Sequence, residues 1–434
     1  MTLLLDDEAP QRKTREECLV ETPPELQTEM MSVLQSSGLV RWIVDAIERA
    51  AVAGEHLLAL VVYLTGTSRL LAKPLAVIVQ GPSASGESFV IERVGRLFPP
   101  EAVLFATDFT PQALYYLAAG ELKHRFIVAG ERSRRQNDET AQATKCLREL
   151  IASGRVSKLV TITDQDGPRT AEVHQEGPIA YVESTTAPEL FEEDANRCLT
   201  LQPDERREQT RRISEAYGRQ LTGELSKEER ELAQQQMQCL HRLLEPLAVV
   251  VPYGLELVRA MPDEPIEVRR VCGLVGSMIQ VVALLHQHQR GRDDLGRVIA
   301  QPEDYWLARQ LLGDVLARCL GGKPADALRR FVHKLCKLSG EFTSKEIATS
   351  LKMSDRTVRE SLNTLLTLGL VKQTEAGRGP IPARWLIADD IALRDESANP
   401  LPPVGAVCGI DESVLVLPEL PADELSANSA DVPF

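Results

Sequence analysis

Residues 75–88 read Leu-Ala-Val-Ile-Val-Gln-Gly-Pro-Ser-Ala-Ser-Gly-Glu-Ser, and this stretch decides the fold. Its first six residues are mostly apolar and include three β-branched ones, which predicts a buried strand. Two glycines follow at the spacing G-x-x-x-x-G, and residues 89–98 then place apolar side chains at helical spacing. A strand, a glycine-rich turn and a helix in this order are typical of a phosphate-binding loop, or P-loop.

A P-loop binds phosphate because its glycines let successive backbone N–H groups point at one anion. The N-terminus of the following helix adds partial positive charge. Ser88 holds the position from which a hydroxyl binds Mg²⁺, so ATP and Mg²⁺ are the expected cofactors. The candidate nucleotide-binding residues of the loop are Gly81, Ser85, Gly86, Glu87 and Ser88.

The loop departs from the motif at Glu87, where a lysine normally reaches the β- and γ-phosphates. A carboxylate at this place repels a triphosphate. One charge pair at ~4 Å and an effective dielectric constant of ~20 amounts to ~4 kcal/mol, here with the unfavourable sign. The sequence therefore predicts a P-loop fold, and Glu87 argues against ATP hydrolysis. A glycine turn without a ligand is the structural alternative.

Composition and charge limit the class of protein. A chain of 434 residues with 43% apolar residues predicts two to three globular domains. The net charge of −14 excludes a wholly basic protein that coats nucleic acid, although a local basic module is compatible with it. None of the eight cysteines forms a C-x-x-C pair, which favours free thiols in a reducing cytoplasm. The chain shows no signal peptide and no run of ~18 apolar residues, so we expect no membrane span.

A second candidate motif ends the predicted strand at residues 125–131. In P-loop ATPases an apolar strand at this distance ends in acids that hold the Mg²⁺ water shell and polarise the attacking water. Gly130 occupies the usual aspartate position, so Glu131 is the available acid, predicted to serve both as metal ligand and as catalytic residue. A buried strand that ends at a surface glutamate is the alternative.

A predicted β-hairpin and a polar strand end follow. Residues 156–163 and 169–174 alternate in polarity around a turn at Asp166-Gly167, and Lys158 and Arg169 lie on this hairpin. The next strand, 178–182, leads into hydroxyl-bearing residues that include Thr185. Such a strand end suits sensing of the γ-phosphate, and a plain polar turn explains it equally well.

Arg197 stands before a final predicted strand at 198–202, where an arginine in a ring ATPase often reaches the nucleotide of the neighbouring subunit. The composition along the chain predicts five regions. These are a flexible leader (1–36), a P-loop ATPase-like domain (37–224), a helical domain (225–321), a winged helix domain (322–390) and a disordered acidic tail (391–434).

The winged helix prediction rests on a change of charge and on helix and strand order. Residues 322–388 hold 12 Lys or Arg against 6 Asp or Glu. Three helices and two short strands follow one another, and the third helix would enter the major groove of DNA. The candidate DNA-binding residues are Arg356, Thr357, Arg359 and Asn363 on that helix and Arg378 at the wing tip. Docking of another protein is the alternative.

Five stretches together carry a resemblance: Gly81–Gly86, Asp108–Leu114, Phe126–Arg134, Glu183–Thr186 and Glu193–Cys198. Over about residues 40–390 the chain resembles the helicase-type ATPase portion of primase-helicases carried by bacterial mobile elements and phages. The resemblance implies an AAA+-like α/β P-loop fold, with helices on both faces of a parallel sheet, and a homo-oligomer, commonly a hexameric ring.

The same resemblance implies roles for single residues and partners. Lys158 and Arg169 would lie near a DNA channel, Arg197 would be the arginine finger, and Glu131 would be the catalytic acid. No primase zinc motif or primase core is present, so the resemblance implies no primase role for this chain and leaves a separate primase partner open.

Three functions remain open from the sequence. The first is an ATP-dependent DNA helicase or translocase of DNA replication with a degenerate P-loop. The second is a catalytically inactive P-loop scaffold whose winged helix binds DNA. The third is a transcription regulator with a helical sensor region. Glu87 favours the second function, whereas Glu131, Arg197 and the hairpin favour the first.

Overall fold

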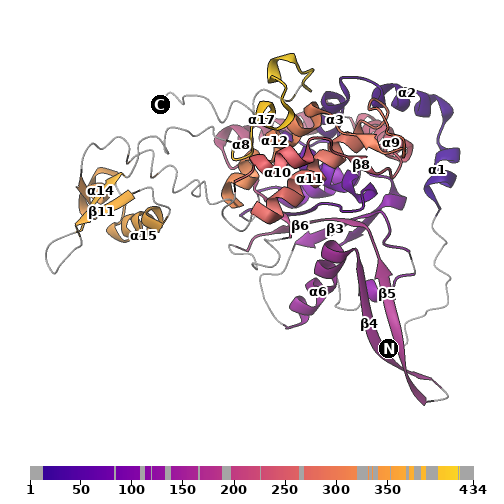
Figure 1. Cartoon of the computed structure of the whole chain (residues 1–434), viewed down its shortest axis with the longest axis horizontal. Coiled ribbons are helices and arrows are strands. Elements are labelled where there is room, and N and C mark those ends of the chain that lie inside the picture. The colour runs from indigo at the N-terminus through magenta and orange to yellow at the C-terminus, as the bar shows by residue number, and fades with distance from the viewer. Residues whose placement is uncertain are drawn as a thin grey trace. The chain divides into compact units, whose positions relative to one another are not determined.

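A computed structural model of the chain describes residues 13–420 with several gaps. The residues outside the description are 1–12, 83–84, 108–112, 119, 132–137, 165–166, 188–196, 225, 263–267, 320–330, 332–334, 336–340, 352, 368–370, 376–382, 388–398, 419 and 421–434. The chain divides into two compact units. Unit 1 consists of residues up to 262, 268–312 and 402–421, and unit 2 contains 313–401. Figure 1 shows the elements of both units.

A five-stranded parallel sheet forms the centre of unit 1. Its strands lie side by side in the order β2-β3-β6-β1-β7. Because the carboxyl ends of parallel strands meet at one edge, the P-loop after β1 lies beside the end of β6, and β6 separates it from the end of β3. The predicted parallel sheet is confirmed. The strands are β1 (Ala76–Gln80), β2 (Val103–Ala106), β3 (Arg125–Glu131), β6 (Ile179–Thr185) and β7 (Leu199–Leu201).

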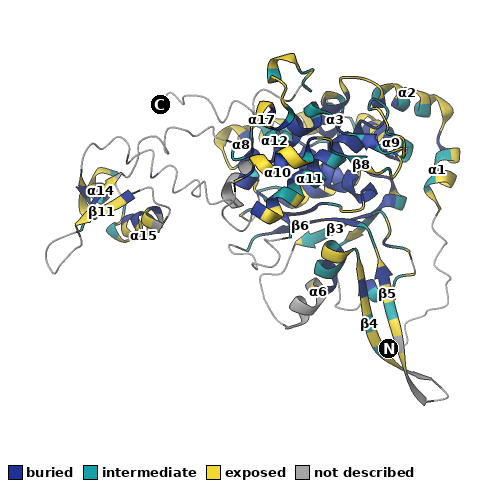
Figure 2. Cartoon of the chain, in the orientation of Figure 1, coloured by how far each residue is buried: buried dark blue, intermediate teal, exposed yellow. Residues whose placement is uncertain are grey.

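Helices before and after β1 cover the sheet, and Figure 2 shows its middle strand β6 in dark blue, the colour of buried residues. The helix before it, α4 (His56–Thr67), is buried from Leu58 to its end. Gly66 on α4 is needed for close packing, since a Cβ there would lie 2.5 Å from the ring of Phe98 and 2.8 Å from that of Phe126. The other helices in the part of the chain that contains the sheet are α3 (Leu39–Arg49), α5 (Glu87–Gly95) and α6 (Asp138–Ser153).

The predicted flexible leader is wrong for residues 13–36. They form α1 (Arg15–Glu21) and α2 (Pro24–Leu34), which both pack on α9 (Lys227–Leu243). Met30 and Leu34 lie one helical turn apart and are fully buried. Two apolar side chains among many polar ones therefore suffice to attach the segment, and the average composition concealed them.

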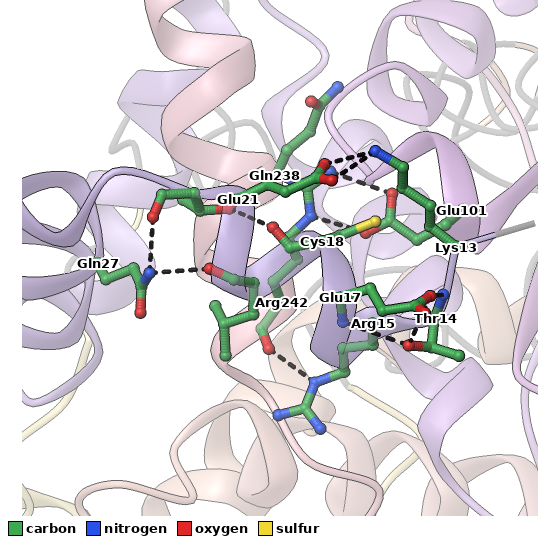
Figure 3. A network of polar contacts seen from close by, with 12 residues as sticks. Lys13, Thr14, Arg15, Glu17, Cys18, Glu21, Gln27, Glu101, Gln238 and Arg242 are labelled. Carbon is green, nitrogen blue, oxygen red and sulfur yellow. Dashed lines mark hydrogen bonds and ion pairs between the residues drawn. The ribbon is translucent and has the colours of Figure 1, made fainter.

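Polar contacts fix the start of this segment, as Figure 3 shows. Thr14 caps α1 and exchanges hydrogen bonds with Glu17 in a capping box. Arg15 donates from Nε to the carbonyl of Arg242 at 2.7 Å, and Arg242 in turn pairs with Glu101 at 2.7 Å. The N-terminal helices are thus tied both to α9 and to the segment before β2.

The predicted hairpin is confirmed and extends away from the sheet (Figure 1). It consists of β4 (Arg155–Asp164) and β5 (Gly167–Glu176), paired antiparallel from Arg155↔Glu176 to Asp164↔Gly167. The connection is therefore residues 165–166, one residue earlier than the predicted Asp166-Gly167 turn. A short 3₁₀ helix, η3 (Ala113–Tyr116), lies between β2 and β3 in the chain.

The helices after β7, as far as Leu312, belong to the same compact unit as the sheet and do not form the separate domain predicted at 225–321. The helix α11 is long and apolar enough to cross a membrane by length and composition alone. It packs against α4, and 56% of it is buried, as in the core helix of a folded domain. The elements are α8 (Arg207–Thr222), α9, α10 (Gly254–Ala260), α11 (Val268–Leu285), α12 (Pro302–Cys319) and the paired strands β8 (Val249–Val250) and β9 (Val298–Ile299).

Unit 2 mixes helices with a small antiparallel sheet. The sheet has the order β10-β12-β11, and two helices pack on one another beside it. Its described core is entirely apolar and consists of Phe331, Leu335, Phe342, Ile347, Val358, Leu362, Leu365, Val371 and Trp385. The elements are β10 (Phe342–Thr343), α14 (Ser344–Leu351), α15 (Asp355–Thr367), β11 (Val371–Glu375) and β12 (Arg384–Ile387).

The predicted disordered tail is wrong for residues 402–418, which return to unit 1 and fold there. The short helix α17 (Val404–Cys408) packs on α10, with Val404 and Val407 buried. Tyr305 and Arg309, one turn apart on α12, both donate to the carbonyl of Pro402, at 2.6 and 3.0 Å. The chain therefore leaves α12 to form unit 2 and comes back to the same helix. A 3₁₀ helix, η4 (Glu412–Val414), follows.

Candidate functional site

Two glycines shape the loop between β1 and α5. Gly86 precedes α5 with φ +90°, a left-handed conformation that favours glycine. Gly81 approaches the loop closely, since a Cβ on it would lie 2.4 Å from the Oγ of Ser85. The described part of the loop thus has the backbone of a phosphate-binding turn that opens a helix.

Glu87 lies inside the loop. Its side chain is 5% exposed, and its carboxylate accepts a hydrogen bond from the hydroxyl of Ser85. The first turn of a helix favours a negative charge, so this placement is locally stable. The charge that a phosphate would meet here is therefore negative, and the residue does not fit a triphosphate.

Ser88 and Ser184 join the P-loop helix to the neighbouring strand. Their Oγ atoms lie 2.9 Å apart, and Ser184 lies on β6, opposite Val79 of β1. Hydroxyl oxygens at this edge are compatible with a Mg²⁺–phosphate group, so Ser88 fits the metal-binding role predicted for it. Ser184 was not among the predicted residues, and the alternation of β6 is the signal that could have found it.

Thr185 points elsewhere. Its side chain is fully buried, and its hydroxyl accepts a hydrogen bond from the backbone of Ala187 at 3.1 Å. Its carbonyl accepts the N–H of Gly81 at 3.2 Å. Thr185 therefore holds the start of the loop in place, while the hydroxyls of its neighbours Ser184 and Thr186 contact Ser88 and Glu131.

Glu131 is brought to this edge by an irregularity in β3. The pairing advances from Val128↔Val182 to Glu131↔Ser184, so β3 carries one extra residue. The carboxylate of Glu131 accepts a hydrogen bond from Thr186 at 2.6 Å. The strand pairing and this bond place Glu131 beside the end of β6, on the strand next to the one that Ser88 contacts.

Gly130 cannot be replaced by the usual aspartate without a shift of backbone. A Cβ on Gly130 would lie 2.4 Å from the carbonyl oxygen of Thr107. The absence of a second acid is therefore built into the packing of this strand against the segment after β2.

Arg197 contacts its own chain. It is half-buried, and its Nη1 donates to the carbonyl of Arg148 on α6 at 2.9 Å. Residues 188–196 before it lie outside the description. A finger role concerns the nucleotide of another copy, and so it stays a prediction.

Of the two hairpin residues predicted to contact DNA, Lys158 has a described side chain and Arg169 does not. The Nζ of Lys158 lies 5.5 Å from the ring centroid of Tyr115. Gln175 on β5 pairs with Val156, on the same face of the hairpin as Lys158, and donates to the carbonyl of Leu117 at 2.6 Å. The face that carries Lys158 is thus turned towards η3. The side chain of Arg169 lies outside the description, and DNA contact by either residue stays a prediction.

Unit 2 exposes most of its predicted DNA-binding residues. Ser354 accepts the N–H of Thr357 at 3.1 Å and so caps α15. Arg356, Thr357 and Asn363 are exposed on α15. Arg359 pairs with Asp355 at 2.7 Å while remaining 60% exposed. Arg378 lies outside the described residues, and groove contact by this helix stays a prediction.

A comparison with protein families adds one finding. The sequence model described as "MTBMA_p00010 P-loop domain" matches residues 24–245, about half of the chain. The match begins with α2 and ends after α9, so it includes the N-terminal helix that the composition concealed. No curated protein matches the chain.

Proposed function

Because the chain belongs to the MTBMA_p00010 P-loop domain family, we propose that it is a nucleotide-binding protein of AAA+-like helicase type. It would move along DNA with ATP and Mg²⁺ during DNA replication, with a P-loop altered at Glu87. Its working form would be a homo-oligomer such as a hexameric ring in the cytoplasm, served by a separate primase.

The strand order carries this proposal. A strand end with hydroxyls beside the catalytic acid of a P-loop ATPase suits sensing of the γ-phosphate. Here β6 separates β1 from β3, and its residues Ser184 and Thr186 bond to Ser88 and Glu131. A scaffold kept only for stability needs no hydroxyls or carboxylate at this edge.

Unit 2 supports the DNA part of the proposal. Its capped helices α14 and α15 and its three-stranded sheet follow the order of a winged helix-turn-helix. In this arrangement Arg356, Thr357, Arg359, Asn363 and Arg378 would contact DNA, with α15 as the recognition helix. Salt dependence of DNA binding would report how many phosphates the basic residues neutralise.

One observation favours a second function. The buried carboxylate of Glu87 bonds to Ser85 within the loop and opposes a triphosphate. In that case the P-loop unit is a catalytically inactive scaffold, and unit 2 binds DNA or a regulatory partner.

The deciding experiment compares the unaltered chain with the Glu87→Lys variant. Nucleotide affinity is measured with a fluorescent ATP analogue, and turnover is measured with and without DNA. Reversal of one charge at the loop is expected to raise affinity roughly a hundredfold or more. The matched control is Glu208→Lys, which makes the same change at an exposed glutamate in the first turn of α8.

The outcomes separate the two functions. DNA-stimulated turnover by Glu87→Lys alone, or by both proteins, supports the ATPase proposal. If neither protein binds nucleotide while both bind DNA, the scaffold function replaces it. An equal gain in Glu208→Lys would show that net charge, and not the loop, controls affinity.

A further inference from the structure

A second basic surface, independent of unit 2, lies on the outer face of α5. Phe89, Arg93 and Arg96 recur at helical spacing along this face. Phe89 is 47% exposed, and the guanidinium of Arg93 lies 4.9 Å from the centroid of its ring. An aromatic ring and two cations therefore share one solvent-facing stripe.

The edge strand β2 adds a second ring to the same surface. Phe105 is also 47% exposed, and the guanidinium of Arg96 lies 5.7 Å from its ring centroid. One side of this ring packs on α5, since a Cβ on Gly95 would lie 3.0 Å from it. Among the described phenylalanines, Phe89 and Phe105 are the exposed ones.

Arg93 and Arg96 bring positive charge to this surface, and Glu92 pairs with Arg96 at 2.7 Å. Burial lowers the pKa of Arg93, and the neighbouring positive charge of Arg230 on α9 lowers it further. The helix α9 is tied to this end of α5, because Gln238 donates to the carbonyl of Arg96 at 3.1 Å. An anion between such guanidinium groups would relieve their repulsion.

We propose that Phe89, Arg93, Arg96 and Phe105 form a binding surface for a single-stranded polynucleotide. Arginines that neutralise phosphates beside exposed rings that stack on bases are the two elements of sequence-tolerant single-strand binding. A duplex offers no free base faces to the rings, so the surface selects single strands. The proposal does not depend on nucleotide turnover at the P-loop.

The test measures binding of fluorescein-labelled oligo-dT and oligo-U to the full chain by anisotropy at low salt. Excess unlabelled duplex occupies unit 2. The Arg93→Gln/Arg96→Gln double variant is expected to lose about tenfold or more in affinity. Phe89→Leu keeps apolar bulk without a ring and is expected to lose about fivefold or more. The relative affinity for the two oligonucleotides distinguishes DNA from RNA.

The matched control is Arg211→Gln/Arg212→Gln on α8. Arg211 pairs with Glu215 one turn away, as Arg96 pairs with Glu92, so the control removes two comparable charges elsewhere. Ultraviolet cross-links to oligo-dT should map to peptides that contain Phe89 or Phe105. Equal losses in both double variants, cross-links confined to other peptides, or a change of oligomeric state without a loss of affinity would each overturn the proposal.

Discussion

The hydroxyl oxygens of Ser88 and Ser184 lie 2.9 Å apart and connect the first turn of α5 to the end of β6. The next residue on β6, Thr185, turns its hydroxyl to the backbone of Ala187 instead. Two adjacent hydroxyls on one strand end therefore have different tasks, one at the loop edge and one within the fold.

Substitution of these two residues should separate binding from stability. Ser184→Ala and Thr185→Val each remove one hydrogen bond, so each is expected to lower the free energy of unfolding by about 1 kcal/mol. In a Glu87→Lys background, nucleotide affinity should fall several-fold for Ser184→Ala and stay unchanged for Thr185→Val. Urea unfolding and nucleotide titration check the pair. A larger loss of nucleotide affinity for Thr185→Val than for Ser184→Ala would show that Thr185 does contribute to nucleotide binding.

Removal of the charge of Glu131 should affect turnover more than binding. Glu131→Gln keeps an oxygen that can accept the hydrogen bond from Thr186. A group that polarises the attacking water contributes about 10²–10⁴-fold to the rate. In a Glu87→Lys background we expect a loss of that size in the hydrolysis rate and at most a few-fold change in nucleotide affinity. An unchanged hydrolysis rate would show that Glu131 does not polarise the attacking water.

Gly130→Ala is expected to destabilise unit 1 by about 1–3 kcal/mol, because the new Cβ would overlap the carbonyl of Thr107. Gly273→Ala is the control. It lies inside α11 with nothing within 4 Å of an added Cβ, and it should stabilise the protein by up to about 1 kcal/mol. Urea unfolding monitored by circular dichroism measures both. Equal changes in the free energy of unfolding for the two variants would show that the overlap with Thr107 does not determine the effect of Gly130→Ala.

His241 should make the protein sensitive to acid. It is buried and stacked on Phe98, and burial followed by the charge of Arg69 holds its pKa well below the ordinary value. The unfolded chain, whose histidine has a pKa of about 6.5, then binds more protons than the folded one at acidic pH. The contribution of neutral His241 to the free energy of unfolding is fully present above about pH 6.5. It is lost as the pH falls below that value, by up to ~1.4 kcal/mol per pH unit for one proton.

His241→Phe keeps the ring and removes two ring nitrogens for which the described structure shows no hydrogen-bond partner. This variant is expected to be about 1–3 kcal/mol more stable at pH 7 and to lose less stability between pH 6.5 and 5. The exposed His174→Gln is the control and should reproduce the parent curve. A parent-like pH dependence in His241→Phe would assign the acid sensitivity to other groups, such as the buried His286.

Local patterns predicted the central sheet well because each strand is short, apolar and followed by a turn. They also predicted the hairpin, whose alternation is regular over 156–163. The role expected of Thr185 could not be checked from sequence, because which of three adjacent hydroxyls faces the loop depends on the register of β6 against β1.

Two segments were wrongly predicted because their average composition, and not their local pattern of apolar residues, was used. Residues 24–34 and 402–418 are polar or proline-containing on average, yet a few apolar side chains at helical spacing attach them to α9 and α10. Average composition measures how much surface a segment could bury. It does not show that two or three side chains will find a prepared partner elsewhere in the chain.

The return of the chain to α12 at Pro402 makes unit 2 an inserted cassette and not an appendage. A single cleavage on either side of it would leave both fragments attached, since Tyr305 and Arg309 of α12 bond to the carbonyl of Pro402 and α17 packs on α10. Two cleavages would excise the cassette and leave α17 in place. In genetic terms, residues 313–401 can be exchanged for another module or for a short bridge while α17 keeps its place on α10.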